Sequence, residues 1–237
     1  MRAVVIGSSG GIGAALVSQL SEHARIEQVY ALSRAGRSFE AGVKMLKLDL
    51  EDEASISDAA KDIAQDGAPD VVIITTGILS DEAGLAPEKS YRQQSKDAFE
   101  KVFLVNTIGP ALIAKHFLPI MPRKGRAVFA AVSARVGSIS DNWIGGWHAY
   151  RASKAALNML IRNYAIEQAR RNEDFIAVGL HPGTVDTDLS KPFQSGVPEK
   201  QLFTADQSAA YLLGVIDGLQ PSDSGKVFDW AGKEIPA

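Results

Sequence analysis

A tyrosine and a lysine four residues apart form the pair in this sequence best suited to proton transfer. Tyr150 and Lys154 occur in the run Tyr-Arg-Ala-Ser-Lys, within a stretch of helical periodicity. A separation of four residues puts both side chains on one face of a helix. An ammonium group beside a phenol stabilises the phenolate and lowers the phenol pKa, as a general acid or base requires. Such pairs also occur on helices without a chemical role, so the spacing alone leaves both interpretations open.

A glycine-rich segment lies near the start of the chain, between a short apolar run and a helical pattern. It reads Gly-Ser-Ser-Gly-Gly-Ile-Gly over residues 7–13, with four glycines in seven residues. Glycines permit a tight turn and bring backbone N–H groups close to a phosphate, and the following helix N-terminus adds partial positive charge. No Lys-Ser/Thr pair follows, which disfavours an ATP or GTP loop. We predict a dinucleotide pyrophosphate site formed by Gly7, Ser9, Gly11, Ile12 and Gly13.

The end of the second predicted strand favours a phosphorylated ribose. Arg34 lies 21 residues beyond Gly13 and directly follows Ser33. In a dinucleotide fold this strand end reaches the adenosine ribose, where an acidic residue accepts from the 2′-hydroxyl and an arginine instead attracts a 2′-phosphate. Ser33 offers a further donor. The sequence therefore predicts NADP(H) rather than NAD(H), with a solvated loop cation as the alternative interpretation of Arg34.

Short runs rich in β-branched residues alternate with longer segments of helical period along the chain. We expect strands at 3–6, 28–32, 44–48, 71–75, 127–132, 176–180 and 227–229, and helices at 12–22, 55–65, 97–117, 149–171 and 205–219. Four strands are nearly all apolar, as in a sheet covered on both faces. The predicted fold class is α/β: a single-domain (1–237), doubly wound Rossmann fold with a mostly parallel seven-stranded sheet. The irregular regions 77–95 and 183–203 follow strand ends, where such sheets bind ligands.

The composition is that of an ordinary globular protein and excludes several function classes. Of the 237 residues, 46% are hydrophobic and 22% charged, and the formal net charge is −3. This balance gives no electrostatic footprint for nucleic acid. The chain has no cysteine, which excludes thiolate nucleophiles and cysteine-ligated metals, and we predict no metal site. No targeting segment is recognisable and polar residues interrupt the apolar window 104–121, so we expect a cytoplasmic protein that does not bind membranes.

The combination of motifs resembles the short-chain dehydrogenase/reductase family. The resemblance rests on the glycine spacing, Asn106, the Tyr150-x-x-x-Lys154 pair and the later Pro-Gly at 182–183. The runs 132–139, 150–154 and 180–185 are similar to the C-factor and sniffer-type carbonyl reductase subgroup. The resemblance implies an NADP(H)-dependent oxidoreductase that moves hydride between the nicotinamide and a small carbonyl or alcohol substrate.

The resemblance also implies a role for each matching position. Tyr150 would exchange a proton with the substrate oxygen, Lys154 would bind the nicotinamide ribose and lower the Tyr150 pKa, and Asn106 would anchor a relay water. Further cofactor contacts are implied near the adenine and the nicotinamide, from Asp49, Leu50, Thr76, Gly77, Pro182, Gly183, Val185 and Thr187. Residues 75–77 read Thr-Thr-Gly where the family usually has Asn-Ala-Gly, which puts the hydrogen bonds of that asparagine in doubt.

The substrate-orienting serine of the family has no direct counterpart. The family pattern is Ser-x-x-Gly, and with Gly137 as the glycine the serine position holds Ala134. Adjacent strand residues point to opposite faces, so Ser133 would serve only where the strand end twists or bulges. We assign Ser133 as the candidate catalytic serine and keep Ser138, 12 residues before Tyr150, as the alternative.

The sequence is compatible with two function classes. The first is a reductase of a carbonyl compound, with the apolar region 190–203 as a lid over a non-polar substrate. The second is an NADP(H)-binding sensor or signalling protein with little turnover, motivated by the altered serine position. The glycine spacing and the Tyr–Lys pair disfavour a methyltransferase. The resemblance implies a homodimer or homotetramer formed through the helices at 97–117 and 149–171.

Overall fold

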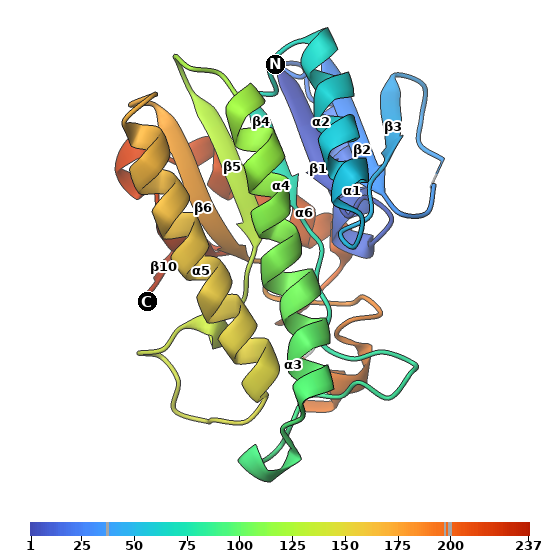
Figure 1. Cartoon of the computed structure of the whole chain (residues 1–237), viewed down its shortest axis with the longest axis vertical. Helices are drawn as coiled ribbons and strands as arrows, with labels where there is room; N and C mark the ends of the chain where they lie inside the picture. Colours follow the sequence, from blue (N-terminus) through green and yellow to red (C-terminus); the bar gives the residue numbers. More distant parts are fainter. Residues whose placement is uncertain (37, 197, 199–200) are drawn as a thin grey trace.

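The chain folds around one eight-stranded sheet with the strand order β10-β9-β6-β5-β4-β1-β2-β3 (Figure 1). The computed structural model describes residues 1–36, 38–196, 198 and 201–237. The strands are β1 Arg2–Ile6, β2 Gln28–Ser33, β3 Val43–Lys47, β4 Val71–Ile74, β5 Ala127–Val132, β6 Phe175–His181, β9 Val227–Asp229 and β10 Glu234–Ile235. All pair in parallel except β10, which is antiparallel to β9. Two further short strands, β7 Thr184–Val185 and β8 Leu202–Phe203, form a separate parallel pair.

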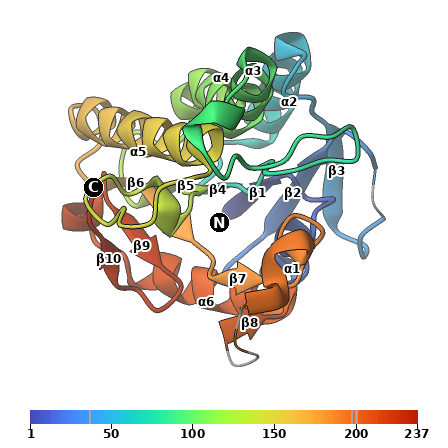
Figure 2. The same cartoon turned by 90° about the horizontal axis from the view of Figure 1, so that it is seen from below.

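Helices cover both faces of the sheet (Figure 2). One face carries α2, α4 and α5, and the other carries α1 and α6. The helices are α1 Gly11–Ser21, α2 Glu53–Asp66, α3 Lys96–Phe103, α4 Gly109–Phe117, α5 His148–Ala169 and α6 Ala205–Gly218. The predicted α/β fold is confirmed, with a correction to the strand number: the sheet has an eighth strand, the two-residue β10.

Burial on both faces explains why the central strands are apolar throughout. In β1, Val4 and Ile6 pack on the side of α2 and α4, whereas Ala3 and Val5 pack on the side of α1 and α6. All four side chains are fully buried. Successive side chains of β1 therefore point alternately into two hydrophobic layers, one on each face of the sheet, and none of these four points to solvent.

The predicted helix at 97–117 is interrupted by one π-helical turn. Leu104–Ile108 forms this turn between α3 and α4. A Cβ at Gly109 would lie 2.8 Å from the Leu50 side chain, so the close approach requires glycine there. By length and mean hydropathy (1.3) the continuous run Lys96–Ile120 is apolar enough to cross a membrane, a test that core helices also pass. Ile113 and Phe117 of this run are fully buried in the core.

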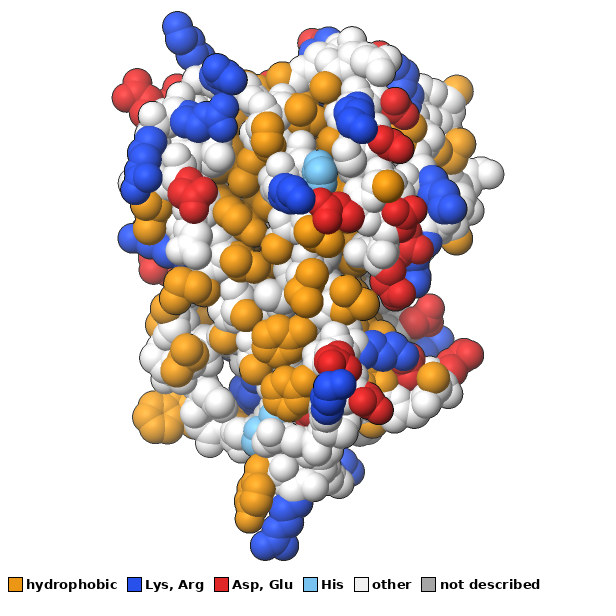
Figure 3. All heavy atoms as spheres, in the orientation of Figure 1, with side chains coloured by type: hydrophobic (Ala, Val, Ile, Leu, Met, Phe, Trp, Pro, Cys, Tyr) orange, Lys and Arg blue, Asp and Glu red, His pale blue; other side chains and the backbone are white. Residues whose placement is uncertain are grey.

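The outer face of α4 and α5 exposes apolar side chains (Figure 3). The exposed fractions are 46% for Ile108, 62% for Met159 and 46% for Ile166. These residues lie on or beside the two helices through which the family resemblance implies association. The homo-oligomer stays a prediction.

Candidate active site

Tyr150 and Lys154 lie in the first two turns of α5, with the Lys154 Nζ 5.8 Å from the centre of the Tyr150 ring. Both side chains are buried. The Lys154 Nζ donates a hydrogen bond to the Val132 carbonyl at the end of β5, at 2.8 Å. A Cβ at Gly77 would lie 3.7 Å from this Nζ and 3.6 Å from the Asn106 Oδ1. The fold therefore brings together four residues predicted from the sequence at the carboxyl ends of the central strands. They come from three segments: the loop after β4, the turn before α4, and α5.

Asn106 joins two of these segments through its side chain. It is fully buried in the π-helical turn. Its Nδ2 donates to the Ile78 carbonyl (2.9 Å) and to the Ser153 Oγ (3.1 Å), and its Oδ1 accepts from the Ile78 N–H (2.8 Å). The amide thus ties the loop after β4 to α5, one residue away from Lys154. Its side chain is committed to protein partners.

Burial sets the protonation of the pair. Desolvation raises the pKa of Tyr150 to about 12 and lowers the pKa of Lys154 to about 8. Without a cofactor, burial therefore works against the lowered tyrosine pKa that the spacing predicts. At neutral pH Tyr150 is a neutral phenol and Lys154 is still an ammonium group. The pair is in the state needed to donate a proton.

An apolar wall surrounds the Tyr150 side chain. Leu79, Ala134 and Tyr150 form a buried cluster against which Val136, Trp147, Leu189 and Phe193 pack. The Trp147 ring lies 6.2 Å from the Tyr150 ring and 5.3 Å from the Phe193 ring, centre to centre. Phe193 belongs to the short helical segment Lys191–Gly196, within the region predicted to form a lid. The wall is thus assembled from four segments: the loops after β4, β5 and β7 and the start of α5.

The structure places the predicted serines away from this wall. The Ser133 Oγ donates to the Asn158 Oδ1 at 2.6 Å, and the side chain is buried on the α5 side of β5. The Ser138 Oγ accepts from the Asp141 N–H in its own loop. Ala134 occupies the place beside Tyr150. The strand end contains no bulge that would turn Ser133 towards Tyr150, because the β5 pairing stays regular through Val132.

The glycine-rich loop is packed as tightly as the sequence predicts. Gly7 has a φ of +94°, and a Cβ there would lie 2.6 Å from the Thr75 Oγ1. A Cβ at Gly13 would lie 2.3 Å from the Gly7 carbonyl oxygen. Ser9 is exposed at the turn and Ile12 is half-buried in the first turn of α1. Only glycine fits at these two contacts.

Several features of this loop fit an anionic group such as a pyrophosphate. The N-cap residue of α1, Gly10, makes no side-chain capping bond, and the first turn contains no acidic residue. The buried hydroxyls of Ser8 and Thr76 have no hydrogen-bond partner within the described part of the chain. Helix N–H groups and unpartnered hydroxyls are the donors that a phosphate uses.

The segment after β6 closes over the same loop. A Cβ at Gly11 would lie 2.9 Å from the Thr187 Cγ2, so the two segments touch. Pro182 is buried, and Gly183 has a φ of +79° with Phe203 packed against it, where a Cβ would lie 2.6 Å from the ring. Val185 is buried in β7. This Pro-Gly is therefore a packed element, and the segment after it brings Thr187 to the glycine-rich loop while Val185 pairs with Phe203 of β8.

The residues predicted around the adenosine lie at the ends of β2 and β3. Arg34 is exposed, and the Ser33 Oγ donates to the Ala35 carbonyl. Asp49 is half-buried, and its carboxylate accepts from the Glu51 N–H. The Leu50 side chain is half-buried and packs against Gly109, the first residue of α4.

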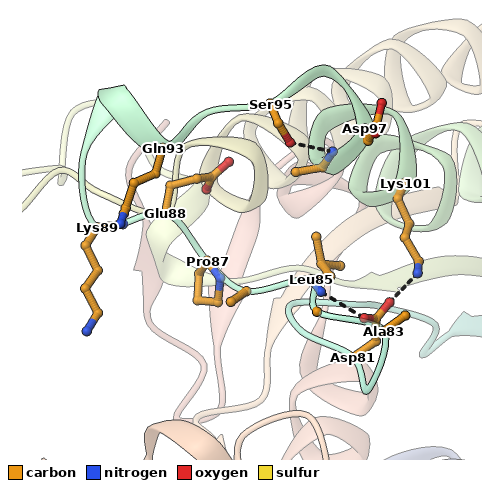
Figure 4. A pocket seen from close by; sticks show the side chains of 13 residues that line it. Asp81, Ala83, Leu85, Pro87, Glu88, Lys89, Gln93, Ser95, Asp97 and Lys101 are labelled. Carbon is orange, nitrogen blue, oxygen red and sulfur yellow. Dashed lines mark hydrogen bonds and ion pairs between the residues drawn. The ribbon is translucent and has the colours of Figure 1, made fainter.

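Sequence reasoning missed Glu88, a buried carboxylate in the loop after β4. It is 4% exposed, and both of its oxygens lie 3.3 Å from the Ala149 N–H at the start of α5. Figure 4 shows this loop where it borders a surface pocket of about 560 Å³, which lies outside the Tyr150 wall. Glu88 and Ala149 are 61 residues apart, and no local pattern links them.

Comparisons with known proteins agree with this arrangement. The sequence profile of the short chain dehydrogenase family matches residues 1–197. C-signal of Myxococcus xanthus is 40% identical over 136 residues, covering 57% of this chain and 76% of that protein. The 1-hydroxy-2-glutathionyl-2-methyl-3-butene dehydrogenase of Rhodococcus sp. (strain AD45) is 33% identical over 233 residues, covering 94% and 93%.

A solved structure covers the whole chain. The NADPH-bound carbonyl reductase from chicken fatty liver superposes with a TM-score of 0.83 at 27% identity, covering 100% of this chain and 98% of that one. The match includes the glycine-rich loop, the β4 loop and α5 in one fold. By profile, by curated relatives and by structure, this chain belongs to the short-chain dehydrogenase family of oxidoreductases.

Proposed function

We propose that this protein is an NADP(H)-dependent oxidoreductase that reduces an apolar carbonyl compound, or oxidises the corresponding alcohol. The observation that carries the proposal is the buried Tyr150 phenol beside the Lys154 ammonium group, at the sheet edge where the glycine-rich loop begins. A neutral phenol next to a fixed positive charge is a proton donor whose conjugate base is stabilised.

The chemistry divides between cofactor and protein. When bound, NADP(H) supplies the hydride that adds to the carbonyl carbon. Tyr150 donates its phenolic proton to the carbonyl oxygen, and Lys154 stabilises the phenolate that remains until solvent returns the proton. Lys154 also binds the nicotinamide ribose hydroxyls. Asn106 bonds to Ile78, in the loop after β4, and to Ser153 in α5. It thereby fixes the distance between α5 and the loop that we expect to contact the cofactor.

The preference for the phosphorylated cofactor rests on the end of β2. Arg34 is an exposed cation directly after Ser33, and the residues that follow it, Ala35 and Gly36, carry no acidic side chain that would repel a 2′-phosphate. The chicken carbonyl reductase, which is 27% identical, binds NADPH. Both observations favour NADP(H).

The apolar wall favours a non-polar substrate. Leu79, Trp147 and Phe193 surround the phenol, and Ala134 replaces the family serine with a methyl group. Burying an apolar substrate against these side chains stabilises the complex by about 25 cal/mol per Å². A charged substrate would have to leave water without a described partner in this wall.

The second candidate is an NADP(H)-binding sensor with little turnover, and Ala134 is the observation that favours it. Without the serine hydroxyl, the transition state loses one hydrogen bond, worth about 1–3 kcal/mol. C-signal, 40% identical over part of its length, carries a name that denotes signalling. A sensor, however, needs neither a buried phenol nor a lysine beside it.

A substrate panel separates the two functions. The purified protein is mixed with NADPH or NADH and with a series of aldehydes, ketones and quinones, and nicotinamide oxidation is followed. We expect faster oxidation of NADPH than NADH, and a Tyr150→Phe variant whose kcat is lower by about 100- to 10,000-fold with NADPH affinity retained. Tight NADPH binding without turnover of any carbonyl in the wild-type protein would instead identify the sensor.

A further inference from the structure

We propose that Glu88 is a positioning residue, which fixes the first turn of α5 and thereby holds the Tyr150 phenol in its proton-donating orientation. The proposal rests on the proposed function, in which Tyr150 is the proton donor. Glu88 touches neither Tyr150 nor Lys154 in the hydrogen-bond network. It acts through the backbone of the two residues that flank His148.

The first observation is the environment of the carboxylate. Glu88 is 4% exposed, and both oxygens accept from the N–H of Ala149. A carboxylate removed from water needs a compensating partner. Here the partner is the N-terminus of α5, where free N–H groups and the helix dipole favour negative charge. The N-cap residue of α5 makes no side-chain capping bond of its own, so Glu88 takes that place from another loop.

The second observation is a strained residue at the same point. Trp147 has a φ of +51°, and it is the one non-glycine residue with positive φ in the described part of the chain. Its N–H donates to the Glu88 backbone carbonyl at 2.5 Å. Left-handed backbone in a bulky residue persists only where the surroundings hold it, and such strain gathers at functional sites. Glu88 therefore binds the chain on both sides of His148, with its carbonyl before it and its carboxylate after it.

The strained turn matters because of where it aims the tryptophan ring. The Trp147 ring packs edge-on against the Tyr150 ring and also contacts Phe193 of the segment predicted to form a lid. A shift of the first helical turn would move both the phenol and its aromatic neighbour. Displacement of a reacting group by about 1 Å can lower a rate by 100-fold. The Glu88 contacts thus connect the loop after β4 to the geometry of proton transfer.

A purely structural cap would behave differently from a positioning residue. Loss of a cap lowers the stability of the folded protein and leaves the turnover of the folded fraction unchanged. Loss of positioning lowers kcat of fully folded protein while NADPH affinity stays the same. The glycine-rich loop lies on another segment, and Lys154, in the second turn of α5, is held by the Val132 carbonyl and not by Glu88. In a variant that lacks the Tyr150 hydroxyl, loss of positioning has no further effect on kcat.

The experiment compares Glu88→Ala and Glu88→Gln with a matched control, Glu82→Ala, which removes an exposed carboxylate from the same loop. We expect Glu88→Ala to lower kcat by at least about tenfold with the NADPH dissociation constant changed by less than about twofold. Glu88→Gln keeps an acceptor oxygen, so it restores most of the lost kcat. In a Tyr150→Phe background, Glu88→Ala has little further effect.

Three results would overturn the proposal: a kcat of Glu88→Ala equal to that of Glu82→Ala, an undiminished effect in the Tyr150→Phe background, or a loss that appears only in NADPH affinity. If Glu88→Ala does not fold, Glu88→Gln takes its place. It keeps one neutral acceptor oxygen instead of two charged ones, so its pH-independent kcat should still lie below that of Glu82→Ala, and equal values contradict the proposal. A wild-type protein without turnover would refute the proposed function alone. In that case hydrogen exchange at residues 148–151 is compared between Glu88→Ala and Glu82→Ala. Faster exchange in Glu88→Ala, with residues 155–169 unchanged, is expected, and equal exchange contradicts the positioning role.

Discussion

The N-termini of α1 and α5 differ in the partners of their free backbone N–H groups. Three other helices of the fold are capped by their own N-cap side chain: α2 by Asp52, α3 by Ser95 and α6 by Thr204, which forms a capping box with Gln207. Gly10 of α1 and Trp147 of α5 make no side-chain capping bond. The end of α1 stays open at an exposed turn, whereas the end of α5 is filled by the buried Glu88 carboxylate.

This difference assigns cofactor binding to the N-terminus of α1 and proton transfer to the N-terminus of α5. An open helix end keeps its N–H groups and partial positive charge for the phosphates of a ligand. A filled end has no capacity left for a ligand anion, but its first turn is held in one position. Tyr150 is in that held turn. Changes at the α1 end should therefore alter cofactor affinity, and changes at the α5 end should alter the rate or the energetics of the buried pair.

The largest effect is expected from the buried ammonium group on α5. Burial lowers the pKa of Lys154 from 10.5 to about 8, so between these pH values the unfolded chain binds more protons than the folded one. The free energy of unfolding should thus rise with pH across this window, by about 3 kcal/mol from this group. A Lys154→Met variant should lack this rise. Chemical denaturation of both proteins from pH 8 to pH 10.5 measures the difference, and identical pH dependence would contradict the burial of an ionisable Lys154.

A smaller effect is expected at the N-terminus of α1, where one substitution should raise the stability of the cofactor-free protein and lower its affinity for NADPH. Ser9→Asp places a negative charge at the open helix N-terminus. The carboxylate should stabilise the cofactor-free protein by about 0.3–1 kcal/mol through the helix dipole. It should also weaken NADPH binding by about tenfold, because like charges repel at short distance. Thermal denaturation and a binding titration test both signs. Unchanged affinity would show that the pyrophosphate does not use this end.

The smallest effect is expected from restoring the family serine. Ala134→Ser puts a hydroxyl beside Tyr150. One added hydrogen bond to the developing oxyanion should raise kcat by about fivefold to tenfold, because the new hydroxyl recovers roughly 1 kcal/mol, the lower end of what the transition state loses without the serine. Ser133→Ala should instead lower stability, by about 1–2 kcal/mol, because the Asn158 Oδ1 loses its donor. Steady-state kinetics and denaturation distinguish the two. A lower kcat in Ala134→Ser would place the substrate oxygen elsewhere.

Most of the fold was predictable because it depends on local periodicity. The expected strand at 127–132 is β5 Ala127–Val132, and the helix at 205–219 is α6 Ala205–Gly218. Two features were not predictable. The π-helical turn contains the buried Asn106, whose side chain bonds to Ile78 and Ser153, contacts made across the fold that no local pattern reveals. The eighth strand has only two residues, too few for a period-2 pattern.

The candidate site divides in the same way. The separation of four residues places Tyr150 and Lys154 together because one helix carries both. The glycine spacing fixes the loop at Gly7 and Gly13 through steric contacts within a single strand–helix unit. The sequence gives no comparable indication for Glu88. Glutamate is rarely buried in proteins, so Glu88 is expected on the surface unless its partner at the N-terminus of α5 is known.

One titration tests the separation between the two helix ends most directly: the initial rate of carbonyl reduction as a function of NADPH concentration, for the wild type, Ser9→Asp and Glu88→Ala. We expect Ser9→Asp to raise the half-saturating NADPH concentration and keep the plateau, and Glu88→Ala to lower the plateau and keep the half-saturating concentration. If both variants changed the same parameter, the open and the filled helix end would not perform separate roles.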